Sequence, residues 1–213
     1  MKTRYKWTVE DYHQLIETGL LEGKPVELLE GELIVRWSAP TASLANPQSE
    51  LSPEGVPHSF TNRTVADYLR ILLQGKAFVS EAHPITLDNS EPEPDIAVVR
   101  LPKDIYKQHH PYPQDIYWLI EISNYTLEKA EQCGLGGFPH EQLFQEDLKE
   151  KTITYARNGI SEYWVIDLPH KKLWVFTQPT SQGYSQIQEF TSGNISPLSF
   201  PDVAIAVNDL LLY

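Results

Sequence analysis

The chain of 213 residues has little cysteine, little basic charge and no long apolar run. Its single cysteine, Cys133, excludes a disulfide within the chain and a cluster of cysteine ligands around a metal ion. No stretch approaches the roughly 18 apolar residues that predict a membrane span. The first eleven residues lack the apolar segment of a secretory signal peptide, so we expect a soluble, cytoplasmic protein that does not associate with membranes.

Basic residues are outnumbered, with 17 Lys and Arg against 29 Asp and Glu and a net charge of −12. This balance argues against a protein that coats nucleic acid without specificity, because contact with phosphates needs a basic surface. The net charge does not exclude a nuclease, since carboxylates around a metal ion add negative charge and a local basic patch can bind the substrate. The length suits one domain spanning residues 1–213.

Two carboxylates stand inside apolar segments that are typical of buried strands. Asp95 precedes the apolar stretch 96–99, and Glu121 lies within the stretch 117–122. A charge in a core strand is costly, on the order of several kcal/mol, unless it is paired or binds a metal ion. The two residues therefore predict a site that needs negative charge, most simply one for a divalent cation.

Alternation along the strands decides which side these carboxylates face. Asp95 shares a face with Ala97, and Glu121 shares a face with Leu119. If the two strands are neighbours in a suitable register, both carboxylates can reach one ion. A simpler role stays open for each residue, because Asp95 could cap a turn after Pro94 and Glu121 could face solvent from an edge strand.

A third charged residue belongs to the clearest predicted helix, residues 141–158. One stripe of this helix, at helical spacing, consists of Phe144, Leu148, Lys151 and Tyr155. The stripe is mostly apolar, so we expect it to face the sheet and to bring Lys151 to the carboxylates. Two ordinary roles for Lys151 stay open: an exposed pair with Asp147, worth roughly 0.3–0.5 kcal/mol, or a stem that covers apolar surface while the ammonium reaches water.

Two carboxylates and a lysine match the needs of metal-assisted phosphodiester hydrolysis. Carboxylate oxygens are ligands that Mg²⁺ or Mn²⁺ prefers, and such an ion polarises a phosphate and lowers the pKa of a bound water. A lysine can orient the nucleophile or offset the charge that builds on the phosphate. We therefore predict that Asp95, Glu121 and Lys151 are catalytic, with Mg²⁺ or Mn²⁺ held by the two carboxylates.

The remaining pattern predicts a mixed α/β (α+β) fold with one central sheet. Helices are expected after a capping box at Thr8 and over 59–73. Residues 38–57 are expected to form a loop. Strands are expected over 78–87, 93–100, 117–123 and 162–167, with an N-terminal hairpin over 26–35 and a C-terminal hairpin over 173–190.

Several of these motifs resemble a large family of putative restriction endonucleases that is abundant in cyanobacteria. The matching segments are Pro94-Asp95, Glu121-Ile122-Ser123, Asp147-x3-Lys151-x3-Tyr155, Gly159-Ile160-Ser161-Glu162-Tyr163-Trp164, Trp7-Thr8-Val9-Glu10-Asp11-Tyr12 and Val26-Glu27-Leu28-Leu29-Glu30-Gly31. The resemblance covers nearly the whole chain. It places the chain in the PD-(D/E)XK nuclease superfamily, which implies a central mixed sheet flanked by helices, a DNA substrate and a divalent metal at Asp95 and Glu121.

The same resemblance implies that the main-chain carbonyl of Ile122 is a further metal ligand. It also implies a supporting role for Glu27 from the N-terminal hairpin. Ser123 holds the position where the superfamily usually has its lysine, which the family supplies from the following helix, at Lys151. Tyr155 is expected to pack against the sheet or to donate a hydrogen bond within the site.

Two further departures from the family pattern could affect activity. Residues 128–146 look inserted before the helix that carries Lys151 and could reshape access to the site. Ala82 stands where many relatives carry Gln, so a contact to substrate could be lost.

Other interpretations remain open. A nuclease-fold protein could bind nucleic acid or a protein partner without catalysis, and a pair of carboxylates could serve glycoside hydrolysis, although a lysine adds nothing to that reaction. Restriction-like nucleases often form homodimers, and the apolar segment 210–213 could serve an interface or close the core. For His58, His83, His109 and His110 we expect surface or capping roles, because no recognised ligand spacing accompanies them. For the aromatic residues of the loops we expect packing rather than stacking on bases.

Overall fold

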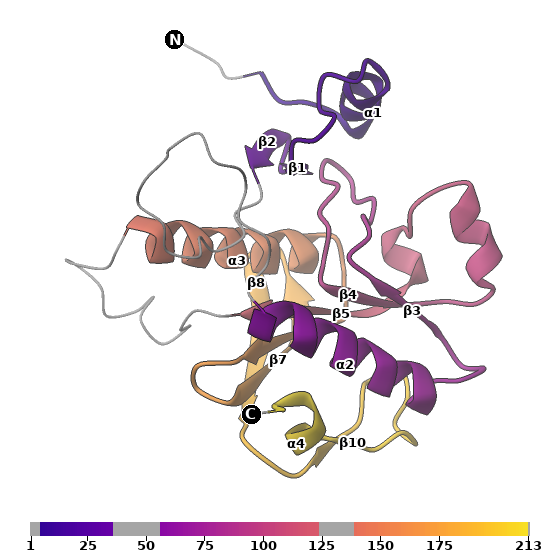
Figure 1. Ribbon diagram of the computed structural model, residues 1–213, viewed down its shortest axis with the longest axis vertical. Helices are drawn as coiled ribbons and strands as arrows, with labels where there is room; N and C mark the ends of the chain where they lie inside the picture. The colour runs from indigo at the N-terminus through magenta and orange to yellow at the C-terminus, as the bar shows by residue number, and fades with distance from the viewer. Residues whose placement is uncertain (1–4, 36–55, 124–138, 213) are drawn as a thin grey trace.

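A six-stranded mixed sheet lies at the centre of the protein, whose computed structural model describes residues 5–35, 56–123 and 139–212 (Figure 1). Its strands, in spatial order, are β3 (Phe78–Glu81), β4 (Ile96–Val99), β5 (Ile116–Ser123), β6 (Glu162–Asp167), β7 (Lys172–Thr180) and β8 (Gly183–Phe190). Only β5 and β6 are parallel within this sheet, and every other neighbouring pair is antiparallel. The expected central mixed sheet is confirmed.

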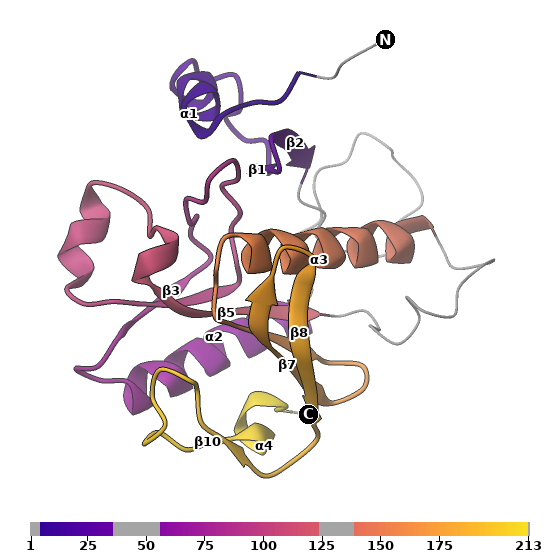
Figure 2. The same cartoon turned by 180° about the vertical axis from the view of Figure 1, so that it is seen from behind.

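Helices cover both faces of the sheet, as the views from the front and from behind show (Figures 1 and 2). They are α2 (Val56–Leu72) and α4 (Val207–Leu210) on one face and α3 (Pro139–Arg157) on the other. Leu69 of α2 packs in one core cluster with Trp118, whereas Tyr155 of α3 packs in the other with Leu119. Adjacent residues of β5 thus enter opposite cores, as strand alternation requires.

The helix α3 connects the two parallel strands, because parallel neighbours need a crossover that usually contains a helix. Its residues Leu148, Lys151 and Tyr155 are all buried against the sheet. This burial confirms the predicted stripe for the part that is described. The side chains of Phe144 and Asp147, and most of the expected insertion 128–146, lie outside the described residues.

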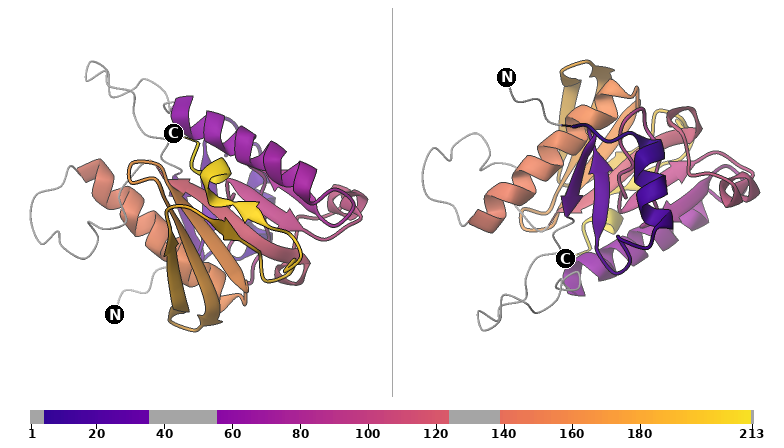
Figure 3. Two further views of the ribbon diagram at one scale, coloured as in Figure 1. Left: turned by 90° about the horizontal axis from the view of Figure 1, so that it is seen from below. Right: turned by 90° about the horizontal axis from the view of Figure 1, so that it is seen from above.

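An N-terminal unit sits beside the sheet and is seen best from above (Figure 3). It consists of α1 (Val9–Glu17), with the expected capping box between Thr8 and Asp11, and the antiparallel hairpin of β1 (Val26–Leu29) and β2 (Glu32–Val35). The hairpin turns at Glu30 and Gly31, which both have positive φ. Main-chain bonds from Glu91 N to Leu28 O and from Gly31 N to Asn89 O tie the hairpin to the segment before β4.

The remaining elements are short. They are the 3₁₀ helices η1 (Lys103–Lys107) and η2 (Pro113–Asp115) and the two-stranded pair of β9 (Asn194–Ile195) and β10 (Ile205–Ala206). At the C-terminal end, Leu210 and Leu211 are buried in the core beside α2, so this part of the apolar segment closes the core. Among the described helices, none combines the length and the apolar character that crossing a bilayer requires.

Several element boundaries differ from those expected, and the strand expected over 93–100 spans only Ile96–Val99. The strand predicted over 78–87 ends at Glu81, because Ala82 adopts a positive φ of 49° that breaks the ladder. The helix α2 begins at Val56, three residues before the predicted start. The rest of the predicted loop 38–57 lies outside the described residues.

Candidate functional site

Asp95 lies directly before β4, where its side chain bonds to the main chain of β5 beyond the end of the β4–β5 ladder. The β4–β5 ladder ends at the pair Ile96–Ile120, so the N–H of Ile122 has no further partner on β4. Oδ2 of Asp95 accepts that N–H at 2.7 Å and also lies 3.1 Å from Nε2 of His58. The carboxylate therefore caps the end of a neighbouring strand rather than a local turn.

The surroundings of Asp95 favour its ionised form. Burial alone would raise the pKa of this carboxyl, but the hydrogen bond and charge of His58, the amide of Ile122 and the charge of Lys151 together hold the pKa below its usual value. A carboxylate that stays charged while buried is the form that a metal ion would bind.

Glu121 lies on a central strand, between β4 and β6, and faces α3. The alternative of an edge strand that faces solvent is therefore wrong. Oε1 of Glu121 accepts a hydrogen bond of 3.0 Å from the hydroxyl of Tyr155 and lies 3.4 Å from Nζ of Lys151. Tyr155 thus both packs against the sheet and donates within the site.

Lys151 points into the protein, with only 6% of the residue exposed. Its Nζ lies 3.4 Å from Oε1 of Glu121 and 3.5 Å from Oε1 of Glu27. An ammonium that reached water along an apolar surface would be exposed, so that alternative is wrong. The lysine is instead held between two carboxylates, as a buried cation requires.

Glu27 enters the site from β1 and is itself buried. Besides its contact with Lys151, its Oε2 accepts the main-chain N–H of Glu93 at 3.1 Å. Glu27 thereby joins three parts of the chain: the hairpin, the segment that leads to Asp95 and α3. The structure places this residue next to the other charged residues, although sequence patterns alone gave no reason to expect it.

The three predicted residues meet around one short piece of β5. Glu121 contacts Lys151 through its side chain, while the next residue, Ile122, holds Asp95 through its amide. In a strand, the N–H and C=O of one residue point to the same edge, so the carbonyl of Ile122 also faces the side where Asp95 lies. Asp95 and Glu121 thus both lie at residues 121–122 of β5, one in contact with the main chain of Ile122 and the other next to it in sequence.

These donors fit a hard divalent cation, because each is an oxygen atom. Mg²⁺ usually takes only one or two protein carboxylates and keeps several waters. In the described part of the chain, no three His, Cys, Asp or Glu side chains converge as a metal cluster. Asp95, Glu121 and the carbonyl of Ile122 would offer oxygen ligands of the kind that Mg²⁺ or Mn²⁺ prefers.

His58 is the residue that sequence patterns missed. We expected a surface or capping histidine, but its side chain is only 12% exposed and its Nε2 contacts Asp95. A signal was present in the helical spacing, because Val65 and Leu69 of α2 face the sheet and His58 lies seven residues before Val65 on the same stripe. Among the other histidines for which we expected such roles, His83 contacts the carbonyl of Glu81 and His109 contacts the carbonyl of His110.

Ser123 and Ala82 flank the site. Ser123 is buried at the end of β5, where its carbonyl accepts the N–H of Leu168. Ala82 donates its N–H to the carbonyl of Asp95 at 3.0 Å, directly after β3. Ala82, where we expected relatives to carry Gln, is therefore in main-chain contact with a site residue.

Comparison with known proteins gives a consistent result. The sequence model of the Uma2 family, described as putative restriction endonuclease, matches residues 9–208. Among solved structures, a putative nuclease belonging to DUF820 from Anabaena variabilis has 17% sequence identity and a TM-score of 0.63, covering 96% of this chain and 97% of that one. At this identity the likeness shows the fold alone. A search of curated proteins finds no match.

Proposed function

The chain belongs to the Uma2 family of putative restriction endonucleases, and on that premise we propose that it is a metal-dependent endonuclease that hydrolyses phosphodiester bonds of DNA. One observation carries the proposal: the buried Lys151 lies against Glu121, whose neighbour Ile122 binds Asp95. Buried charges of both signs are costly to keep in a core unless they serve chemistry or are fully paired.

Asp95, Glu121 and the carbonyl of Ile122 would hold Mg²⁺ or Mn²⁺. When bound, such an ion polarises a phosphate and lowers the pKa of a water molecule. We name both ions because oxygen ligands suit both of them.

The protein side chains divide the remaining work. The ammonium of Lys151 offsets negative charge that builds on the phosphate. The hydroxyl of Tyr155 fixes Glu121, while the amide of Ile122 and the ring of His58 fix Asp95. Such supporting contacts keep reactive groups within reach of the substrate in a set geometry.

A plasmid-nicking assay with Mg²⁺ or Mn²⁺ tests this function. The variant Glu121→Gln should nick at least about a hundredfold more slowly, on the scale seen when one charge-stabilising group is lost. Glu162→Gln is the matched control, because Glu162 is also a buried glutamate on the adjacent strand but contacts Trp164 and the N–H of Leu198 instead. Cleavage without metal, or equal rates for both variants, would rule out the proposed site.

A second function is favoured by the way the carboxylates are engaged. Asp95 accepts a hydrogen bond from the N–H of Ile122, and Glu121 accepts one from the hydroxyl of Tyr155. A protein that only binds nucleic acid or a protein partner could keep this network without any metal. Titration calorimetry with Mn²⁺ separates the two functions. Heat of binding that disappears in Asp95→Asn supports the enzyme, whereas no heat at millimolar Mn²⁺ supports the non-catalytic protein.

We also propose that the chain acts as one domain on DNA in the cytoplasm. The N-terminal hairpin is tied to α3 through Glu30, whose Oε1 accepts a hydrogen bond of 2.9 Å from Thr154 and whose Oε2 lies 3.6 Å from Arg157. Together with the pair between Glu27 and Lys151, these contacts support a hairpin that unfolds with the sheet in a single transition, which urea denaturation followed by two probes would test.

A further inference from the structure

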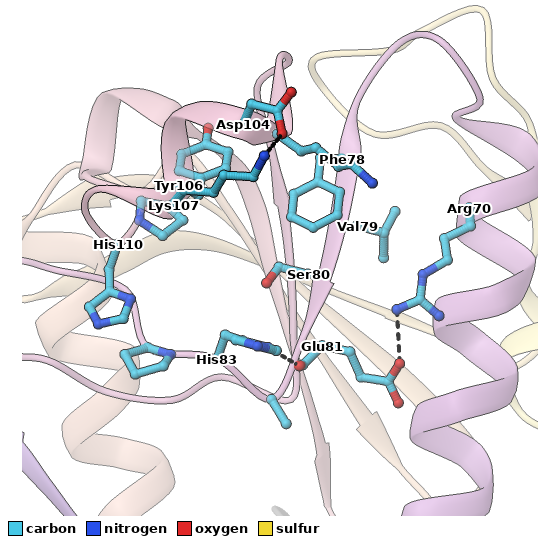
Figure 4. Close-up of a pocket in the computed structure, with 14 residues that line it drawn as sticks. Arg70, Phe78, Val79, Ser80, Glu81, His83, Asp104, Tyr106, Lys107 and His110 are labelled. Atoms are coloured by element: carbon cyan, nitrogen blue, oxygen red, sulfur yellow. Dashed lines mark hydrogen bonds and ion pairs between the residues drawn. The ribbon is translucent and has the colours of Figure 1, made fainter.

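A groove of about 500 Å³ runs along the outer side of β3, the edge strand of the sheet (Figure 4). Tyr106, Lys107 and His110 stand on one side of β3, and Arg70 of α2 stands on the other. No strand of the central sheet pairs with this edge of β3. We call this feature the β3 groove, and its volume falls in the range of small-ligand pockets.

The lining of the β3 groove carries three cations against two carboxylates, Glu81 and Asp104, in a chain whose net charge is −12. Arg70, Lys103 and Lys107 line it. Arg70 is paired with Glu81 at 2.9 Å and Lys107 with Asp104 at 2.6 Å. Ion pairs on the protein surface are weak. A phosphate can therefore take the place of a carboxylate as the partner of an exposed lysine at little cost in free energy.

Two aromatic side chains line the groove together with these cations. The rings of Phe78 and Tyr106 are nearly parallel, with 6.3 Å between their centroids and 19° between their planes. The hydroxyl of Tyr106 donates a hydrogen bond of 3.0 Å to the carbonyl of Arg100, which fixes the orientation of the ring. Flat rings beside lysine and arginine are the combination that holds single-stranded nucleic acid, because bases stack on the rings while phosphates meet the cations.

The end of β3 lies next to Asp95. Glu81, at the end of β3, pairs with Ile96, and Ala82 donates its N–H to the carbonyl of Asp95. Because Ala82 has a positive φ, the chain turns away at this point and β3 ends beside Asp95. A strand of nucleic acid that follows the edge of β3 would therefore reach the segment that carries Asp95.

We propose that the β3 groove binds an unpaired strand of DNA, so that the preferred substrate is single-stranded DNA. Stacking on Phe78 and Tyr106 requires bases that are free of a partner strand. With 29 acidic residues against 17 basic ones, the chain is poorly suited to holding a duplex over an extended surface by its phosphates. The inference rests on the proposed function for the identity of the site that the strand reaches.

Fluorescence anisotropy with a labelled single-stranded oligodeoxynucleotide, and with the matching duplex, tests the β3 groove. The measurement is made in EDTA, so that binding is observed without cleavage. The wild-type protein should bind the single strand about tenfold more tightly than the duplex. Tyr106→Leu should weaken single-strand binding roughly tenfold, which is the scale for one lost stacked base.

A charge variant keeps the test decisive if Tyr106→Leu fails to fold. In Lys103→Gln/Lys107→Gln both changes are at exposed positions, and the slope of log affinity against log salt should fall by about 0.7 for each lost phosphate contact. Lys24→Gln/Lys171→Gln is the matched control, because it removes the same charge from exposed lysines that do not line the groove. The control should bind as the wild type does.

Two outcomes would overturn the inference: equal or tighter binding of the duplex, or unchanged binding in both groove variants. Nicking assays distinguish this failure from failure of the proposed function. If Glu121→Gln abolishes nicking while the groove variants bind normally, the function stands and the β3 groove does not. If the groove variants lose binding while Glu121→Gln nicks at the wild-type rate, the β3 groove stands and the proposed site does not.

Discussion

Nζ of Lys151 lies 3.5 Å from Oε1 of Glu27, which links the N-terminal hairpin to the crossover helix α3 inside the protein. Both side chains are buried, so neither charge can be satisfied by bulk water. Glu27 and Glu121 share the lysine between them, and the hairpin is therefore part of the candidate site rather than an appendage.

Replacing Glu27 should show how much this link contributes to stability. Glu27→Gln leaves the buried Lys151 short of one partner, and we expect a loss of roughly 1–3 kcal/mol in the free energy of unfolding. Glu32→Gln breaks an exposed pair with Lys6 and should cost at most ~1 kcal/mol. Urea denaturation of both variants checks this difference. Equal losses of stability would show that the buried pair contributes no more than the exposed one.

Removing the hydroxyl of Tyr155 should destabilise the protein through Glu121. A buried hydrogen bond to a charged group contributes roughly 1.5–3 kcal/mol, so Tyr155→Phe should cost that much and should slow nicking. The control is Tyr184→Phe, because the hydroxyl of Tyr184 donates to the neutral carbonyl of Ile160 and should contribute only about 0.5–1.5 kcal/mol. A smaller loss for Tyr155→Phe than for the control would contradict a charged acceptor at Glu121.

The pH dependence of stability should carry a signature of Glu162. Burial raises the pKa of this carboxyl above 4.5, although bonds from the N–H of Leu198 and the indole of Trp164 lower it in part. The folded state therefore holds the proton more tightly than the unfolded state. This contribution is present below the ordinary pKa and is lost as the pH rises through the raised value.

The free energy of unfolding of the wild-type protein should thus fall, relative to that of Glu162→Gln, as the pH rises from about 4 through the raised pKa of Glu162. Chemical denaturation at a series of pH values measures the difference. A constant difference between the two proteins across this window would contradict a raised pKa.

The turn of the hairpin should tolerate no side chain at Gly31. Its φ is +75°, and a Cβ would lie 3.1 Å from the carbonyl oxygen of Trp7. Gly159 has the same conformation, with φ +74°, but nothing lies within 4 Å of a Cβ there. Gly159→Ala should cost about 1–2 kcal/mol for the left-handed backbone alone, and Gly31→Ala should cost more. Thermal unfolding of the two variants compares these costs, and a smaller loss at Gly31 would show that the hairpin shifts freely.

Periodicity was sufficient to predict which side chains share a face. The alternation of β5 put Glu121 with Leu119, and the stripe of α3 put Lys151 with Tyr155, and both pairs lie in the core on the same side of the sheet. Period decides orientation because it follows from the backbone itself. The fold class could be predicted for the same reason.

Contacts that depend on where one element docks against another could not be predicted. The pairing of His58 with Asp95 depends on how far α2 extends past the end of β4, which no local pattern records. The end of β3 depends on the positive φ of Ala82, a residue that does not ordinarily mark a turn. The role of Glu27 depends on the docking of the hairpin against α3, and only the family resemblance pointed to it.

The candidate site draws one charged residue from each of four separate stretches: β1, the approach to β4, β5 and α3. No contiguous fragment that omits the hairpin or α3 contains them all, so a partly synthesised or partly collapsed chain cannot assemble the set. During refolding from urea, nicking activity should therefore recover only when the last of these elements has docked. Its recovery should lag behind the return of secondary structure.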